Sequence, residues 1–276
     1  MGKVSEIGGE RYLKAIRKIQ KDKEVKAVVL RVNSGGGSAF ASDVIWHEIE
    51  ELQSKNIPVV VSMGDYAASG GYYIACGSDR IFAEPTTITG SIGVFGITLD
   101  MQKFYNNKLG ITYDGVKTAP FADIPTSVFL SRSINDEEKS IVQGFVEDIY
   151  DDFLEKVAEG RSKTVEQIHE IAQGRVWSGV KALEIGLVDE LGGLEDAIAE
   201  AAKMAEVNSY ELDSYPKIEF NISELLKEKF PLPFAKAELP APIVQFLGGQ
   251  EIIDLIMGLE TMNPIQARMP FDINME

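Results

Sequence analysis

Two β-rich runs, each followed at once by a turn of small residues, constrain this chain most. Residues 27–32 precede a glycine turn, Asn33-Ser34-Gly35-Gly36-Gly37-Ser38, and residues 58–63 precede a turn at 65–71 that contains Ser69. Short strands that alternate with helices build a parallel sheet. The pattern therefore predicts an α/β fold in which the glycine turn presents backbone N–H groups toward the Ser69 hydroxyl.

The remaining apolar periodicity predicts further strands and helices. Expected strands lie at 27–32, 58–63, 80–83 and 112–116, and expected helices at 41–54, 69–76, 101–109 and 135–159. The run Ser133-Ile134-Asn135-Asp136 predicts the start of the long helix, and Thr164 with Gln167 forms a capping box. We therefore expect a parallel sheet with flanking helices.

The composition of the chain changes after Met204. A helical piece is expected at 222–229, a proline-rich stretch follows at 230–242, and an apolar helix-like stretch covers 251–262. We therefore expect one domain over residues 1–204 and an extension over 205–276. The extension is expected to pack on the domain or on a neighbour, and its apolar stretch either completes the core or makes an assembly contact.

Charge and composition exclude several classes of protein. A net charge of −16 would repel a polyphosphate backbone, so we expect no nucleic-acid partner. Cys76 is the only cysteine, and His47 and His169 are the only histidines, so we expect neither a disulfide nor a metal site. No cofactor is expected. No stretch approaches the roughly 18 apolar residues of a membrane span, so the chain as given is expected to be soluble.

Ser69 has the setting of a nucleophile. An alcohol at the start of a buried helix lies in a positive backbone field that favours developing negative charge. The simpler interpretation is a serine that caps the helix. Gly70 and Gly71 weigh against a simple cap, because a cap needs no glycines behind it and glycines let a substrate backbone approach closely.

Several motifs in order resemble the signal peptide peptidase A family of serine proteases. They lie at 31–38, 67–73, 89–96, 174–179 and 186–189, within a matching region from about Val25 to Met204. The resemblance implies a Clp/crotonase-like fold of repeated ββα units. It also implies that Ser69 is the nucleophile and that the Gly36 and Gly70 amides form the oxyanion hole. Ser91 matches a serine that orients a catalytic lysine.

The general base is missing at its usual place. A lysine base needs a dry, cation-poor pocket that lowers its pKa from about 10.4 toward neutrality. Shorter relatives carry this lysine at the position that matches approximately Ala122. Longer members have two homologous halves, with the serine in the C-terminal half and the lysine in the N-terminal half. This chain resembles the C-terminal half without its first strand, so the resemblance implies a lysine from outside the chain. Lys117 is the local alternative, and the competing interpretation is a solvated lysine.

The histidines do not indicate a Ser-His-Asp triad. His47 lies among acidic neighbours on an expected exposed helix face, and His169 lies beside Glu166 and Glu170 on another helix. The carboxylates of residues 147–152 alternate with apolar residues, which is typical of the solvated side of an amphipathic helix. Neither pattern competes with a serine and lysine pair.

The resemblance implies a serine endopeptidase that degrades extended hydrophobic peptides such as cleaved signal peptides. It also implies a homo-oligomer associated with the inner membrane and facing the periplasm or outside, with the upstream half of the same protein as a partner. Two other functions stay open. The run Ala68-Ser69-Gly70-Gly71 with Cys76 and Asp79 also resembles crotonase-like acyl-CoA enzymes, and a non-catalytic assembly module is the third possibility.

Overall fold

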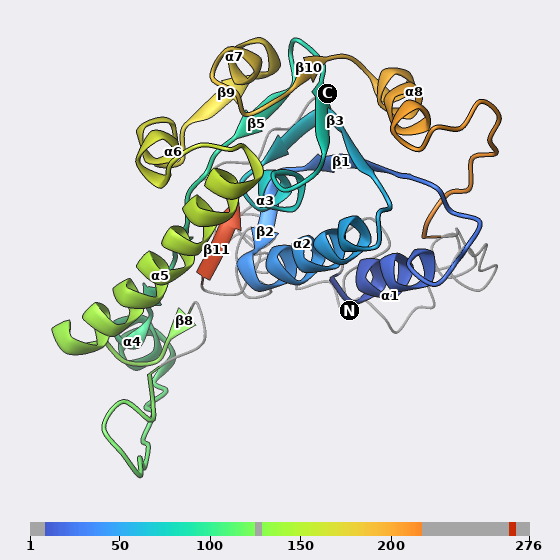
Figure 1. The fold of residues 1–276 in the computed structure, drawn as a ribbon. Helices are drawn as coiled ribbons and strands as arrows, with labels where there is room; N and C mark the ends of the chain where they lie inside the picture. The colour runs from blue at the N-terminus through green and yellow to red at the C-terminus, as the bar shows by residue number, and fades with distance from the viewer. Residues whose placement is uncertain (1–8, 125–128, 217–264, 269–276) are drawn as a thin grey trace, which may run out of the picture.

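The computed structural model describes residues 9–124, 129–216 and 265–268 of the 276-residue chain. A largely parallel sheet with helices on both faces forms its body (Figure 1). The strands of this sheet are β1 (Val28–Ser34), β3 (Val59–Ala68), β4 (Arg80–Ala83), β5 (Ile88–Gly90), β9 (Val176–Ser178) and β10 (Glu190–Leu191). The predicted α/β class and three of the four predicted strands are confirmed.

The long strand β3 organises the sheet. It pairs with β1 on one side and with β4 and then β5 on the other, always in parallel, and only β9 joins antiparallel, on β5. In the first pairing Val28 lies opposite Val59, and near the other end Ser34 lies opposite Ala67. This register carries the glycine turn after β1 to the end of β3, where Ser69 follows.

The helices of the body lie on both faces of the sheet, and a further helix lies in an arm described below. They are α1 (Gly9–Ile19), α2 (Ala39–Ser54), α3 (Gly70–Ala75), α4 (Gln102–Phe104), α5 (Asp136–Gly160), α6 (Val165–Ile171), α7 (Gly179–Glu184) and α8 (Leu194–Met204), and a π-helical turn, Tyr105–Leu109, continues α4. All four predicted helices are present within a few residues of their expected bounds. The capping box of Thr164 and Gln167 is confirmed, and Asn135 forms a second one with Glu138.

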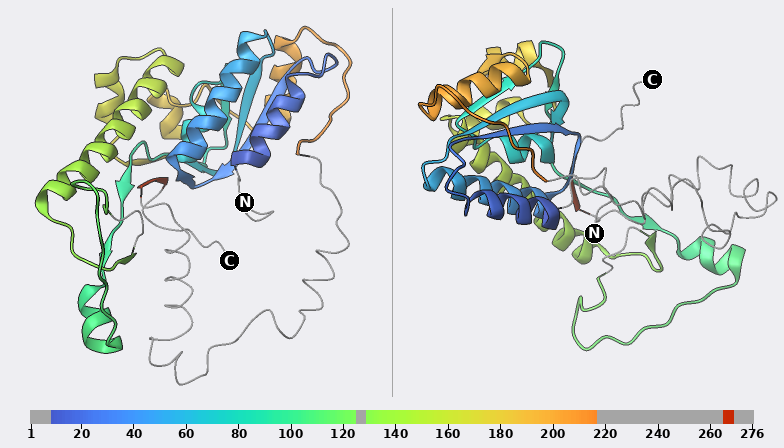
Figure 2. Two further views of the ribbon diagram at one scale, coloured as in Figure 1. Left: turned by 90° about the horizontal axis from the view of Figure 1, so that it is seen from below. Right: turned by 90° about the vertical axis from the view of Figure 1, so that its right-hand side faces the viewer.

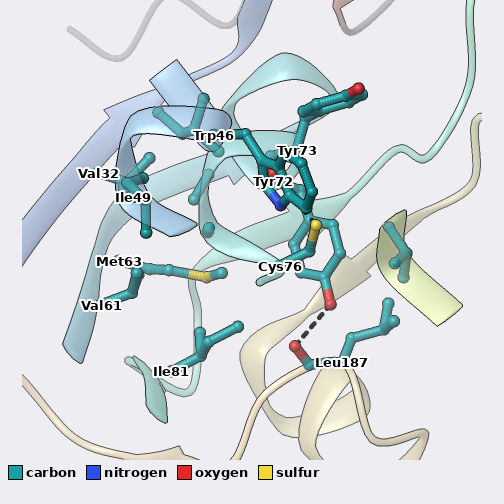
Figure 3. Packing of buried hydrophobic residues seen from close by; sticks show 14 of the residues in the cluster. Val32, Trp46, Ile49, Val61, Met63, Tyr72, Tyr73, Cys76, Ile81 and Leu187 are labelled. Atoms are coloured by element: carbon teal, nitrogen blue, oxygen red, sulfur yellow. Dashed lines mark hydrogen bonds between the residues drawn. The ribbon is translucent and has the colours of Figure 1, made fainter. Parts of the chain in front are cut away.

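Successive side chains of β3 point to opposite faces of the sheet, so the core consists of two clusters. Val59, Val61 and Met63 face the large cluster that α2 and α3 cover, whereas Val60 faces a smaller cluster with Phe82, Ala197 and Ala201 beneath α8. Figure 3 shows how Tyr72 of α3 crosses the large cluster. Its hydroxyl donates to the Leu187 carbonyl oxygen at 2.8 Å, so α3 is fixed to a segment more than a hundred residues away.

Residues 99–124 form an arm that projects from the body (Figures 1 and 2). The arm begins at β7 (Leu99–Asp100), which pairs with the returning strand β8 (Phe129–Leu130). The predicted strand at 112–116 is wrong, because these residues have no regular structure. Tyr113 and Val116 are exposed there, and the segment takes part in none of the sheets of the described residues.

A second, smaller sheet lies beside the glycine turn. Its strands are β2 (Gly36–Ser38), β6 (Phe95–Gly96) and β11 (Ile265–Arg268), and β11 lies between the other two and runs antiparallel to both (Figure 1). The helices predicted at 222–229 and 251–262 and the proline-rich stretch lie outside the described residues. The domain division at residue 204 therefore stays a prediction, although α8 does end at Met204. In the part of the chain that the structure describes, no helix is both long and apolar enough to cross a membrane.

Candidate active site

Ser69 adopts a backbone conformation that L-residues avoid. It follows the last residue of β3 with φ 52° and ψ −119°. Sparsely populated conformations of this kind cost about 1–3 kcal/mol and persist only where neighbouring contacts enforce them. Here the Ser69 N–H donates to the Gly90 carbonyl oxygen at 2.8 Å, and the Tyr73 N–H donates to the Ser69 carbonyl oxygen at 2.8 Å. The turn therefore has the fixed, strained form that is typical of functional sites.

The Ser69 side chain does not cap α3, the helix that follows it. Its Oγ makes no bond to the first turn of α3, which removes the simpler interpretation of this serine. The hydroxyl donates instead to the Gly93 carbonyl oxygen at 3.4 Å, which is long for an O–H···O bond. The residue has no exposed surface. The hydroxyl is therefore buried but only weakly engaged.

The glycine turn lies against the start of α3. A β-carbon on Gly71 would stand 2.5 Å from the Ser34 carbonyl oxygen, so the two backbones are in direct contact. Gly36 has φ 101°, and its N–H donates to Ser34 Oγ at 3.2 Å. Gly70 is the first residue of α3, where amides have no partner within the helix. The structure thus brings Ser69, Gly70 and the Gly36 turn together.

Ser91 lies next to this cluster, directly after the neighbouring strand β5. Gly90 pairs with Ala68, so the residues that follow each of them, Ser91 and Ser69, leave the sheet side by side. Ser91 is buried and also has a positive φ, 49°, and its N–H donates to the Arg175 carbonyl oxygen at 2.7 Å. All four residues predicted for the site therefore converge at one corner of the molecule.

Lys117 is placed elsewhere. It lies in the arm, half-exposed, with its Nζ 3.3 Å from an Asp123 carboxylate oxygen. Asp123 also pairs with Arg132, so another cation is close by. A lysine base needs the opposite surroundings, dry and free of cations. Among the residues that the structure describes, no lysine hydrogen-bonds Ser69.

The histidines lie outside the serine cluster. His47 is exposed on α2, with Nδ1 3.6 Å from Glu50. His169 on α6 contacts Tyr150 and Gln173. Neither bonds to Ser69, so the described geometry contains no Ser-His pair.

The helix that follows Ser69 is dry and uncharged. Burial raises the pKa of the Cys76 thiol to about 12, so this thiol is neutral at physiological pH. Burial also raises the pKa of Tyr72 well above its usual range, and burial with a hydrogen bond to Asp43 raises the pKa of Tyr73. No thiolate is therefore available to compete with the serine as a nucleophile.

Three parts of the site were not predicted from the sequence: two carbonyl groups and one strand. The Gly90 and Gly93 carbonyls bind Ser69, and both flank Ser91 in the motif at 89–96, so that motif carried the signal. The third part is β11, in which Arg268 lies opposite Gly36 and Ala267 opposite Gly37. Its backbone also approaches α2 and α3. No motif marks residues 265–268 in the sequence.

Comparisons with known proteins assign the family. A family model described as peptidase family S49 matches residues 51–208. Protease 4 of Salmonella typhi is 41% identical over 245 residues, which cover 86% of this chain and 39% of that protein. The chloroplastic serine protease SPPA of Arabidopsis thaliana is 38% identical over 203 residues, which cover 74% of this chain and 29% of that protein.

A solved structure is also similar. A point mutant of ClpP1 from Listeria monocytogenes aligns with a TM-score of 0.46 and 18% identity, over 69% of this chain and 86% of that one. This chain spans well under half of the length of the two curated relatives named above. The resemblance to the signal peptide peptidase A family is confirmed, and the chain belongs to peptidase family S49.

Proposed function

We propose that this chain carries the nucleophilic serine of an endopeptidase that binds its substrates as extended strands. The observation that carries the proposal is the position of β11. An extended segment fits between β2 and β6 with antiparallel pairing on both sides, directly beside Gly36. A peptide that took this place would pair with β2 and β6, and such strand pairing gives affinity through main-chain hydrogen bonds.

The chemistry begins with the Ser69 hydroxyl. Its Oγ attacks the carbonyl carbon of a peptide bond, and the proton passes to a general base. The Gly70 amide, and the Gly36 amide once it leaves Ser34 Oγ, would stabilise the oxyanion, and the loss of one such donor typically costs about 10²–10³ in rate. The weak bond from Ser69 Oγ to the Gly93 carbonyl oxygen costs little to break when the base takes the proton.

The base is proposed to be a lysine from the upstream half of a longer protein. Two observations support an outside source. Lys117 lies in a solvated ion pair, and the relatives are much longer than this chain. Ser91 lies beside Ser69, where a hydroxyl accepts a hydrogen bond from an ammonium without adding charge. It would therefore orient the incoming lysine while leaving its environment neutral.

The substrates are proposed to be hydrophobic peptides such as cleaved signal peptides. A substrate strand presents alternate side chains to the same face, so apolar pockets on that face would read every second residue. The resemblance to the family further suggests a homo-oligomer at the outer face of the cytoplasmic membrane, with residues 205–276 as an extension that packs on the domain or on a neighbour.

The test compares this chain alone with the chain joined to its upstream half. A fluorophosphonate probe and a hydrophobic peptide substrate report the reactivity of the serine and turnover, respectively. The joined protein should label at Ser69 and cleave the peptide, and Ser69→Ala should abolish both. Cys76→Ala is the matched control, since it removes a buried neutral group from the same helix. Hydration of a crotonyl thioester in place of peptide cleavage would refute the proposal.

A further inference from the structure

Residues 90–93, which bind Ser69, are themselves held in place by another part of the chain. Ser69 binds two carbonyls of residues 90–93, through its N–H to Gly90 at 2.8 Å and through its Oγ to Gly93 at 3.4 Å. Residues 90–93 contain two positive φ angles, at Gly90 and Ser91. Such a segment keeps its shape only where neighbours enforce it.

Residues 173–176, here called the brace, are those neighbours. The Ser91 N–H donates to the Arg175 carbonyl oxygen at 2.7 Å, and the Gly174 N–H donates to the Ile92 carbonyl oxygen at 2.9 Å. A β-carbon on Gly93 would stand 2.9 Å from the Gly174 nitrogen, so the two backbones abut. The position of Ser69 therefore depends on the conformation of the brace.

The brace also has a conformation that needs support. Gln173 has φ 60° and Gly174 has φ 74°, so two successive residues are in the left-handed region. Glycine accepts such a conformation readily, whereas glutamine does not. Contacts of the glutamine side chain are therefore expected to offset the cost of this backbone conformation.

The Gln173 side chain contacts two residues, one before it and one after it in the sequence. Its Oε1 accepts from the Arg175 guanidinium at 2.8 Å, and its Nε2 lies 3.0 Å from His169 Nε2. Its backbone N–H donates to the Tyr150 hydroxyl oxygen at 3.3 Å. One residue thus ties α5, α6 and Arg175 to the turn.

The donors and acceptors of this network are mutually consistent. Because Gln173 Oε1 accepts from Arg175, the Gln173 amide nitrogen must donate to His169 Nε2. His169 then carries its proton on Nδ1, from which it donates to the Tyr150 oxygen at 3.1 Å. Each group has one arrangement that satisfies the others, which makes the network a defined support.

From these contacts we infer that Gln173 is a positioning residue for Ser69. It acts through the brace and residues 90–93 and does not touch the reacting atoms. The inference rests on the proposed function for its catalytic meaning. The structural part, that the Gln173 side chain fixes the Ser69 turn, is measurable without turnover.

Hydrogen exchange of the Ser69, Ser91 and Gly174 amides tests the structural part in this chain. Gln173→Ala should speed their exchange by about tenfold, since it removes two side-chain hydrogen bonds. Gln173→Gly also removes the side chain but relieves the left-handed backbone, so it separates the two effects. Gln173→Glu keeps an acceptor for Arg175 but cannot donate to His169 Nε2, so its exchange should lie between those of the wild type and Gln173→Ala.

The Val28 amide, which bonds to Pro58 at the far end of the sheet, serves as the internal reference. Gln143→Ala removes the same type of side chain from an exposed site on α5 and should change none of these amides. Wild-type exchange in Gln173→Gly would overturn the inference, because backbone geometry alone would then hold the turn.

Kinetics of the joined protein test the catalytic part. Gln173→Ala and Gln173→Gly should lower kcat by about tenfold with KM within about twofold, and Gln173→Glu should restore part of kcat, because it keeps the contact with Arg175 alone. An unchanged kcat beside faster exchange would overturn the positioning role. A joined wild-type protein without peptidase activity would refute the proposed function, and the exchange result would still decide whether Gln173 holds the turn.

Discussion

Gly71 and Ser34 are in contact so close that a side chain on residue 71 has no room. A β-carbon there would stand 2.5 Å from the Ser34 carbonyl oxygen and 3.3 Å from Ser34 Cβ. The contact joins the two small-residue turns that the sequence places after β1 and β3. It is therefore the point at which the glycine turn and the serine turn are fixed relative to each other.

Gly71→Ala should destabilise the fold, because the obstructing atoms belong to backbone that cannot rotate away. Overpacking of this kind costs about 1–3 kcal/mol. Urea denaturation measures the free energy of unfolding. Gly144→Ala is the control, since a β-carbon there meets nothing within 4 Å on an α5 surface, and it should be neutral or slightly stabilising. Equal stabilities of the two variants would contradict the close contact.

Ser69→Gly should be more stable than Ser69→Ala. Both remove the hydroxyl, but only glycine relieves the φ of 52°. The expected difference is about 1 kcal/mol in the free energy of unfolding. Thermal and urea denaturation of the two variants check it. If alanine proved the more stable, the backbone at residue 69 would not be strained.

Glu138 should contribute stability that depends on pH. Hydrogen bonds from Arg132 and from the Asn135 backbone lower its pKa to about 2 from an ordinary 4.5. Since the folded pKa lies below the unfolded one, the contribution is complete above about pH 4.5 and is lost as the pH falls toward 2. The stability gap between wild type and Glu138→Gln should therefore be full at pH 7 and shrink between pH 4.5 and 2.

The neighbouring Glu137→Gln is the control for this titration, because Glu137 is exposed on the same turn of α5. Its stability should follow that of the wild type across the same range of pH. A gap for Glu138→Gln that did not narrow below pH 4.5 would show that the ion pair with Arg132 is not its source.

Cys76 should resist alkylation in the folded protein. It is the only cysteine of the chain, it has no exposed surface, and burial raises its pKa to about 12. Iodoacetamide at pH 8 should modify it only under denaturing conditions, as followed by intact mass. Rapid stoichiometric modification of the native protein would contradict the packing of α3.

The strands of the main sheet could be predicted where the residues of a single strand are apolar enough to indicate it. β1, β3 and β4 each contain a run of three apolar residues, and the Ser69 turn follows β3 directly. The strand predicted at 112–116 failed because Tyr113 and Val116 are exposed and the segment pairs with no other strand in the described part of the chain. β5 and β9 are short and depend on pairing with each other and with β3, which no local pattern records.

The same limit applies to the site. Ser69, Ser91, Gly36 and Gly70 lie in motifs, so they were predictable as residues. The carbonyl of Gly93 and the brace at Gln173 act through contacts between distant segments. The sequence marked residues 174–179 as a motif, directly after Gln173, and indicated no role for Gln173. The Gln173 side chain and backbone contact α5, α6 and Arg175, and such contacts between separate elements leave no local pattern in the sequence.

The most direct test of the account is the rate of fluorophosphonate labelling at Ser69 in this chain alone and in the chain joined to its upstream half. A base from outside the chain predicts labelling of the joined protein, much slower labelling of the chain alone, and no effect of Lys117→Ala on either. Equally fast labelling of the chain alone, retained after Lys117→Ala, would contradict a base from outside the chain.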